Sequence, residues 1–249
     1  MSFFAVDRNV KICYYINSKE VKQMKYKYEL HCHTKETSLC GQVPAAEIVK
    51  MYKEAGYSGI VITDHYSPMT FKPSRVWRPQ TDMDFYLSGY KEALKYADEN
   101  FTVLLGMEIR YYATANDYLV YGVTEDFLRN SGNLMKVYPK KFYKLAKENG
   151  MLVVQAHPFR KLMIRTNPKY LDGTEIHNGK ADIESNLKSA QWAEENNMAI
   201  RVSGSDFHRP KNLANGGIIT NEPIKTNDDL LRILRSGEFE MIGEEFNNS

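Results

Sequence analysis

Short runs of apolar and β-branched residues recur along the chain, and segments with helical periodicity separate most of them. Because this alternation is typical of parallel strands joined by helices, the pattern predicts an α/β fold with a mainly parallel sheet. Seven strands of this kind can close into a distorted barrel. The predicted strands cover residues 26–30, 59–63, 102–107, 118–122, 151–155, 173–176 and 199–204.

Proline and glycine residues mark the ends of two predicted helices. Pro44 suits a first helical turn and Gly56 a helix stop, and Pro139 and Gly150 bracket a second helix in the same way. The periodicity predicts further helices at about 83–99, 183–196 and 227–236.

One connection between predicted strands is too short for a crossover helix. Only ten residues lie between Met107 and Tyr118, so we expect an antiparallel hairpin there. No repeat, low-complexity tract or linker divides the chain, so we expect a single barrel domain over residues 26–249. Residues 1–25 precede the first strong strand, and we treat them as an N-terminal extension without an assigned role.

Composition narrows the class of protein and its expected partners. Apolar residues make up 43% of the 249 residues and charged residues 26%, as in an ordinary globular protein, and the formal net charge is +2. Because basic and acidic residues are interspersed, nucleic acid and anionic membrane are not expected partners. No apolar stretch reaches the length of a spanning helix, no secretory signal is recognisable, and three cysteines (Cys13, Cys32 and Cys40) are an odd number, so we expect a cytoplasmic location.

All six histidines lie at or just after the carboxyl end of a predicted strand. His31 and His33 are two residues apart in an extended segment, so their side chains share one face while Cys32 points the other way. In α/β barrels the loops at this end of the strands build the active site. We therefore expect the histidines to converge.

Carboxylates accompany the histidines at the ends of the other strands. Asp64 and His65 follow one strand, Glu108 another, His157 a third, and Asp206 with His208 repeats the two-residue spacing, as the sequence shows. Zinc, manganese and iron accept imidazole and carboxylate together, and Glu108 is the candidate to bridge two ions. The alternatives are structural: Asp64 could cap a turn, and His157 could be a satisfied core histidine.

The ordered segments HCH, TDH, GME, AHP and SDFH resemble the PHP family, which is named for its polymerase and histidinol phosphatase members. The resemblance spans about residues 26–220. It implies a distorted seven-stranded barrel, phosphoester hydrolysis by a metal-activated water, and two or three ions of Zn, Mn or Fe. The ligands that it implies are His31, His33, His65, Glu108, His157, Asp206 and His208.

The chain departs from the family pattern at two ligand positions. Where many members have an acidic or histidine ligand after the first motif, this chain has TKETSLCG, so Glu36 is the expected substitute and Cys40 the alternative. Near the fourth strand, Asp117 is either a replacement ligand or a turn residue.

Further residues are candidates for roles around the metals. Asp64 is expected to orient a ligand histidine, His177 to line the pocket as a proton donor or substrate contact, and Arg160 either to clamp a phosphate or to face solvent. The loop at 66–84 forms either a lid or ordinary packing over the site. An anion-binding rim would add Arg75, Arg78, Lys161, Arg165 and Arg209.

The leading hypothesis is a metal-dependent phosphoesterase that acts on a small phosphorylated metabolite or nucleotide. Three alternatives remain open: a nuclease-like phosphodiesterase on DNA or RNA ends, a non-catalytic metal-binding regulatory domain, and an amidohydrolase-like hydrolase of carbon–nitrogen bonds. The sequence does not specify the oligomeric state.

Overall fold

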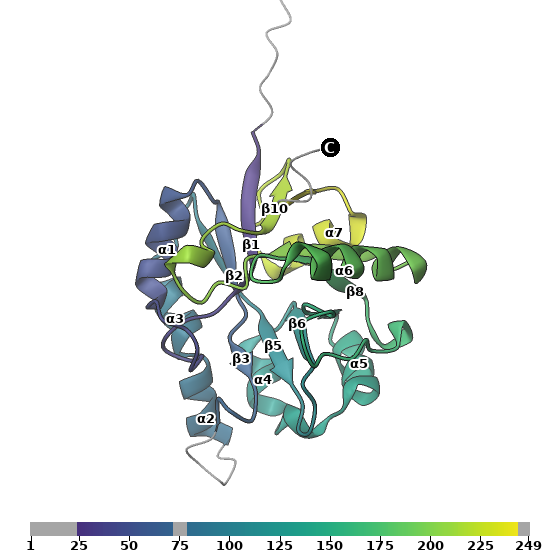
Figure 1. Cartoon of the computed structure of the whole chain (residues 1–249). Coiled ribbons are helices and arrows are strands. Elements are labelled where there is room, and N and C mark those ends of the chain that lie inside the picture. The colour runs from purple at the N-terminus through teal and green to yellow at the C-terminus, as the bar shows by residue number, and fades with distance from the viewer. Residues whose placement is uncertain (1–23, 72–78, 244–249) are drawn as a thin grey trace, which may run out of the picture.

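The computed structural model describes residues 24–71 and 79–243, whose strands form two sheets. The first sheet has the order β11-β10-β1-β2-β4, formed by Glu240–Ile242, Gly217–Thr220, Tyr26–Cys32, Gly59–Ile62 and Thr102–Leu105. The second has the order β3-β5-β6-β7-β8-β9, formed by His65–Tyr66, Met107–Arg110, Asp117–Tyr121, Leu152–Gln155, Gly173–Asn178 and Ile200–Gly204. Figure 1 shows the strands at the centre of the molecule.

The two sheets meet at the carboxyl end of β1. Phe207, just after β9, forms a parallel bridge with Cys32, and its backbone exchanges hydrogen bonds with His31 and His33 at 3.0 Å each. The predicted strand at 102–107 is divided at Gly106 into β4 and β5, where a side chain would lie 2.8 Å from Val61. This close approach lets the chain pass from one sheet to the other.

All seven predicted strands are present, but the pairing is more mixed than the pattern indicated. Five strand pairings within the described residues are parallel and four are antiparallel. The predicted hairpin is confirmed, with Arg110 opposite Asp117 in the β5–β6 register. Since the hairpin reverses β6, its other neighbour β7 is antiparallel to it as well. The result is a mixed α/β fold of two sheets, with β3, β10 and β11 in addition to the predicted strands.

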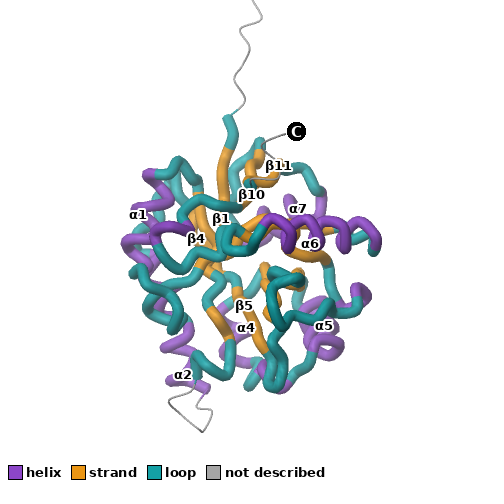
Figure 2. The backbone as a smooth tube through the Cα atoms, in the orientation of Figure 1, coloured by secondary structure: helices purple, strands orange, loops and turns teal. Residues whose placement is uncertain are grey.

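Helices surround the sheets (Figure 2). In chain order, α1 to α7 are Ala45–Glu54, Pro79–Tyr86, Ser88–Leu94, Glu125–Asn130, Pro139–Glu148, Ile183–Glu195 and Asn227–Ser236. Single 3-10 turns lie at Leu134–Lys136, Pro168–Tyr170 and Pro210–Asn212. Helices α1 and α3 pack near β2 and β4, whereas α5, α6 and α7 pack on β7, β8 and β6. None of the helices in the described ranges is long and apolar enough to cross a membrane.

The helix ends follow local sequence signals except at one place. Pro139 opens α5, Gly150 follows it with a φ of +74°, and α7 begins with a capping box between Thr226 and Asp229. The helix predicted at 83–99 is instead two helices, α2 and α3, and the second ends at Leu94. Gly89 in α3 packs directly on the side chain of Thr34 next to the histidine cluster, which is a tertiary contact that periodicity does not reveal.

Candidate metal centre

The side chains that the sequence singled out gather where strand ends meet. His31 belongs to β1, His33 follows it, and Glu108 lies in β5, while His65 is the first residue of β3. His157 follows β7, and Asp206 and His208 follow β9. Cys32 points away from them into an apolar cluster and is fully buried, as the alternation predicted. Five of the six histidines therefore converge.

Glu108 lies at the centre of the cluster and faces four imidazoles. Its Oε1 is 3.1 Å from His157 Nε2 and 3.3 Å from His31 Nε2. Its Oε2 is 2.6 Å from His65 Nδ1 and 3.4 Å from His33 Nε2. Because each oxygen faces a different pair of histidines, this carboxylate has the arrangement needed to bridge two cations.

Asp206 forms the second acidic point of the cluster. Its Oδ1 is 3.1 Å from His208 Nδ1, 3.4 Å from His33 Nε2 and 3.6 Å from His31 Nε2. Its Oδ2 is 3.2 Å from Lys180 Nζ, on the side of the cluster that faces the pocket described below. One oxygen thus faces the imidazoles while the other faces a cationic side chain.

The donor set fits divalent cations. Four overlapping groups of three residues have ligand atoms within 4.8 Å of one another: His33, His65 and His208; His31, His33 and Glu108; His31, His157 and Asp206; and Glu108, Asp117 and His157. His31 Nε2 and His33 Nε2 are buried without a hydrogen-bond partner. Buried polar atoms are rarely left unpaired, so these two nitrogen atoms indicate a missing partner that is an electron-pair acceptor.

The ionisation of Glu108 and His33 suits metal ligands, whereas at His31 and His65 burial, which lowers the pKa, is outweighed by Glu175 and Glu108, which raise it well above its ordinary value. Burial alone would raise the pKa of Glu108, but His65 and His31 hold it well below its ordinary range. Burial lowers the pKa of His33 well below its ordinary range, and the nearby His65 and His208 lower it further. Charged carboxylate and neutral imidazole are the forms that coordinate cations.

The backbone is strained at two of the strand ends. His157 and Asp206 have φ angles of +29° and +49°, a region that residues other than glycine seldom adopt. Such strain concentrates at functional sites. Gly204, two residues before Asp206, allows close packing, because a Cβ there would lie 2.5 Å from the Cβ of His31.

Two buried glutamates that sequence reasoning missed support the cluster. Glu175 Oε1 accepts a hydrogen bond from His31 Nδ1 at 2.9 Å, and its Oε2 accepts one from the His157 backbone N–H at 2.9 Å. Glu29 Oε1 accepts from the backbone N–H groups of His31 at 2.8 Å and Ser205 at 2.9 Å. The sequence did carry a signal for both residues, because each is a glutamate within an apolar strand. Burying a carboxylate costs free energy unless it has hydrogen-bond or charged partners.

Asp64 supports the cluster indirectly. Its oxygens accept hydrogen bonds from the backbone and hydroxyl of Thr34 and from the Ser38 hydroxyl, each at 2.7 Å. Ser38 Oγ lies 3.4 Å from His33 Nδ1 and accepts from the His65 backbone N–H at 3.0 Å. Burial raises the pKa of Asp64 to about 6 against these hydrogen bonds. Asp64 therefore reaches the ligand histidines through Ser38.

The two proposed substitute ligands have different positions. Both oxygens of Glu36 accept from the backbone N–H of Ala45 at 3.1 Å, so Glu36 caps α1 and is not placed to be a ligand. Asp117 is buried in the group with Glu108 and His157, but its carboxylate also pairs with Arg110 at 2.6 and 2.5 Å. The sequence showed both carboxylates but not the N–H group and guanidinium that pair with them.

His177 does not join the cluster, contrary to the expectation that it lines the pocket. Its Nε2 lies 2.7 Å from the Asn215 carbonyl oxygen, and its Nδ1 is 3.3 Å from the Asn186 amide nitrogen. A register shift in β8 between Glu175 and His177 breaks the two-residue alternation. Such a bulge re-aims a side chain, so Glu175 faces the cluster while His177 packs near Gly243.

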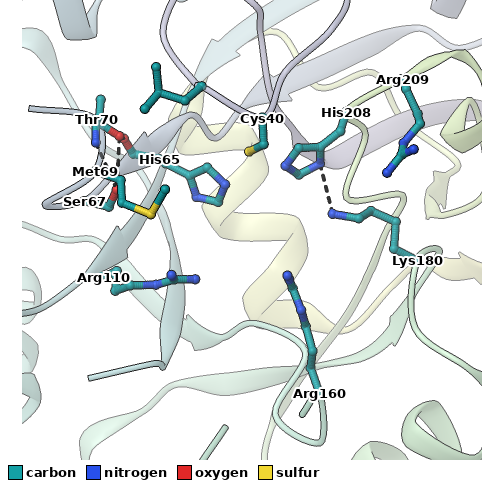
Figure 3. Close-up of a pocket in the computed structure, with 11 residues that line it drawn as sticks. Cys40, His65, Ser67, Met69, Thr70, Arg110, Arg160, Lys180, His208 and Arg209 are labelled. Carbon is teal, nitrogen blue, oxygen red and sulfur yellow. Dashed lines mark hydrogen bonds between the residues drawn. The ribbon is translucent and has the colours of Figure 1, made fainter. Parts of the chain in front are cut away.

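A pocket of about 240 Å³ opens onto the cluster (Figure 3). His65 and His208 form one side of it, together with Cys40, and Arg110 and Arg160 lie across from them. The remaining lining residues are Leu39, Ser67, Met69, Thr70, Lys180 and Arg209. Four cationic side chains therefore surround a small cavity at the edge of the proposed ligand set.

The predicted cationic rim is partly correct. Arg160 and Arg209 line the pocket, whereas Lys161 and Arg165 are not among its lining residues, and Arg165 lies over the ring of Phe159 at 5.0 Å. Arg75 and Arg78 lie outside the described residues, as do residues 72–78 of the predicted loop at 66–84. Most of the predicted N-terminal extension also lies outside them. The lining cations that sequence reasoning missed are Arg110 and Lys180.

The mixed α/β fold of this protein and its cluster of histidines and carboxylates at converging strand ends are the features expected of a metal-binding protein. A family model for the PHP domain matches residues 29–214, which is most of the chain. The protein therefore belongs to the PHP family of metal-dependent phosphoesterases, as the five motifs implied. No curated protein matches the chain in sequence.

Solved structures share the fold at low sequence identity. PsfC from Pseudomonas syringae PB-5123 superposes with a TM-score of 0.64 at 14% identity, covering 88% of this chain and 91% of that one. A two-domain protein from Bacteroides vulgatus ATCC 8482, which contains a predicted PHP-like metal-dependent phosphoesterase, gives 0.61 at 17% identity. That match covers 89% of this chain and 66% of the other, so this chain spans about two thirds of that protein's length.

A third structural relative corrects the expectation that nucleic acid is not a partner. PfuEndoQ from Pyrococcus furiosus, a lesion-specific endonuclease, gives a TM-score of 0.57 at 14% identity over 88% of this chain and 58% of its own. Endonuclease Q has also been crystallised with a 27-mer duplex that carries an abasic lesion at the active site. A net charge near zero therefore does not exclude nucleic acid as a partner, since phosphate contacts come from individual side chains around a site.

Proposed function

We propose that the protein is a metal-dependent hydrolase that cleaves the phosphate ester of a phosphorylated metabolite or nucleotide in the pocket of Figure 3. The observation that carries the proposal is the juxtaposition of four cationic side chains with the histidine–carboxylate cluster around one cavity of about 240 Å³. Cations attract the phosphate, and the cluster supplies the ligands that metal ions need.

Two or three ions of zinc, manganese or iron are the proposed cofactors, and they would supply Lewis-acid activation of water and of the phosphoryl oxygens. The cluster residues proposed to hold them are those that the family motifs mark. They are His31, His33, His65, Glu108, His157, Asp206 and His208.

The side chains of the pocket wall are proposed to bind and orient the phosphate. Arg160 Nη1 lies 3.9 Å from Asp206 Oδ2, and Lys180 Nζ lies 3.2 Å from the same oxygen, so both cations border the cluster. Arg110 is fixed by its two hydrogen bonds to Asp117 and lines the same pocket. A guanidinium can contact two phosphate oxygens at once, which makes Arg160 and Arg110 suitable for orienting the ester.

Phosphate release from a panel of phosphomonoesters, nucleotides and phosphodiesters tests the proposal. Protein loaded with manganese or zinc should release phosphate, His33→Ala should abolish release, and Arg160→Ala should raise KM by about tenfold or more because a charged hydrogen bond is lost. Arg232→Ala is the matched control, since Arg232 is an exposed arginine on α7 that pairs with Glu222. No turnover of any panel member by metal-loaded protein would refute the proposal.

A phosphodiester in DNA is the second candidate substrate class, and the structural similarity to PfuEndoQ favours it. The same panel separates the two classes when it includes single-stranded and duplex oligonucleotides, with and without an abasic lesion. Cleavage of an oligonucleotide that falls steeply with added salt would indicate contacts to several phosphates. Release of phosphate from small monoesters alone would indicate the first class.

A further inference from the structure

Cys40 lies at the open side of the histidine cluster. Figure 3 shows its sulfur between the rings of His65 and His208, at the wall of the pocket that these three residues line. The residue is exposed to solvent and forms no disulfide. Its sulfur is therefore accessible to an ion that enters through the pocket.

A second observation points to a ligand at the same place. The ligand nitrogens of His33, His65 and His208 lie within 4.8 Å of one another, and the ring of His33 is 4.2 Å from each of the other two rings. Nε2 of His33 is buried and has no hydrogen-bond partner. Three imidazoles packed this closely, one with an unpaired buried nitrogen, have the composition of a cation site that lacks its remaining ligand.

The carboxylates nearest in sequence do not supply that ligand. Glu36 is occupied by the backbone N–H of Ala45, and Asp64 accepts its hydrogen bonds from Thr34 and Ser38. Cys40 is the nearby residue whose side chain faces His65 and His208 instead.

The loop that carries Cys40 is held in place by backbone hydrogen bonds. Ser38 N–H donates to the Thr34 carbonyl at 3.0 Å, and Gly41 N–H donates to the Ser38 carbonyl at 2.8 Å. Gln42 N–H donates to the His208 carbonyl at 2.8 Å, which ties this loop to the loop after β9. The position of the sulfur beside His208 is thus built into the fold.

We infer that Cys40 is a thiolate ligand of a zinc ion that is also held by His33, His65 and His208. The thiol gives up its proton to solvent as the sulfur–zinc bond forms, and no oxidation or reduction takes place. Because thiolate is a soft ligand, this site favours zinc over manganese, whereas the carboxylate-rich groups around Glu108 accept either ion. The inference rests on the proposed metal centre and specifies the ion at one of its positions.

Cobalt substitution tests the assignment independently of catalysis. Protein loaded with Co²⁺ should show a sulfur-to-cobalt charge-transfer band in the near ultraviolet, and Cys40→Ser should lose it. Cys40→Asp should lose the band but retain the bound metal, because a carboxylate can replace the thiolate as a ligand. Leu39→Ala is the matched control: Leu39 is the exposed neighbour that also lines the pocket, and its removal should leave the band unchanged.

Zinc content provides the second readout. After dialysis against excess manganese, wild-type protein should retain zinc at this position, and Cys40→Ser should exchange it for manganese, as measured by elemental analysis. A wild-type spectrum without a charge-transfer band, or a band that persists in Cys40→Ser, overturns the inference even if the protein hydrolyses phosphate esters. A band that depends on Cys40 in a protein without turnover supports the inference and counts against the proposed function instead.

Discussion

Glu175→Gln is the substitution whose effect can be worked out most fully, because it keeps the size of a buried side chain and removes its charge. The two oxygens of Glu175 accept hydrogen bonds from His31 Nδ1, the His157 backbone and Asn178 Nδ2, each at 2.9 Å. A carboxylate accepts at both oxygens, whereas the glutamine amide accepts at one atom and donates at the other. At least one of the three donors must therefore face an NH₂ group.

Asn178 cannot relieve the mismatch by turning its amide around. Its Oδ1 already accepts a hydrogen bond from the Lys180 backbone N–H at 3.0 Å, so rotation would break that bond. A buried donor without an acceptor costs about 1–3 kcal/mol. Losing the carboxylate partner of a ligand histidine typically lowers metal affinity by about 10- to 100-fold, which is about 1.4–3 kcal/mol.

Two measurements check this prediction. Denaturant unfolding of the metal-free protein should show Glu175→Gln destabilised by about 1–3 kcal/mol, and titration with Zn²⁺ should show the loss of affinity. Glu222→Gln is the matched control: Glu222 is exposed and pairs with Arg232, and such surface pairs contribute about 0–1 kcal/mol. If Glu175→Gln bound zinc as tightly as wild type and unfolded at the same denaturant concentration, Glu175 would not position His31 as argued.

Three further predictions concern charge and metal. Burial raises the pKa of Asp64 from 3.8 to about 6, so folding favours its protonated carboxyl group. At pH values below the unfolded pKa, this preference contributes its full amount to the stability of the metal-free protein. The free energy of unfolding of the wild-type protein should therefore fall by about 3 kcal/mol as the pH rises through the folded pKa. The free energy of unfolding of Asp64→Asn, measured in urea over the same pH range, should not show this fall. Lys180→Met should raise KM for a phosphomonoester by about tenfold with little change in kcat, since a charged contact is removed; an unchanged KM would exclude phosphate binding by Lys180. Chelation should lower Tm, since ions at 1,000 times their Kd stabilise by about 4 kcal/mol, and an unchanged Tm would contradict a bound centre.

The sequence determined the elements and most of the proposed ligand set through short-range rules. Alternation placed His31 and His33 on one face and Cys32 in the core, and the ten-residue spacing before Tyr118 required the hairpin. Proline, glycine and capping residues marked the ends of α5 and α7. These features follow from steric and hydrogen-bond rules within a few residues, so they can be predicted from the local sequence.

Only the tertiary structure decided which partner each polar side chain meets. The backbone N–H of Ala45 takes Glu36 away from the cluster, and the bulge after Glu175 turns His177 from it. Lys180 lies beside Asp206, and Cys40 lies between two histidines, because segments that are distant in sequence pack together. Local pattern fixes the face of a strand from which a side chain projects, but its partner depends on how separate segments pack and on small register shifts, which leave no mark in hydrophobic periodicity.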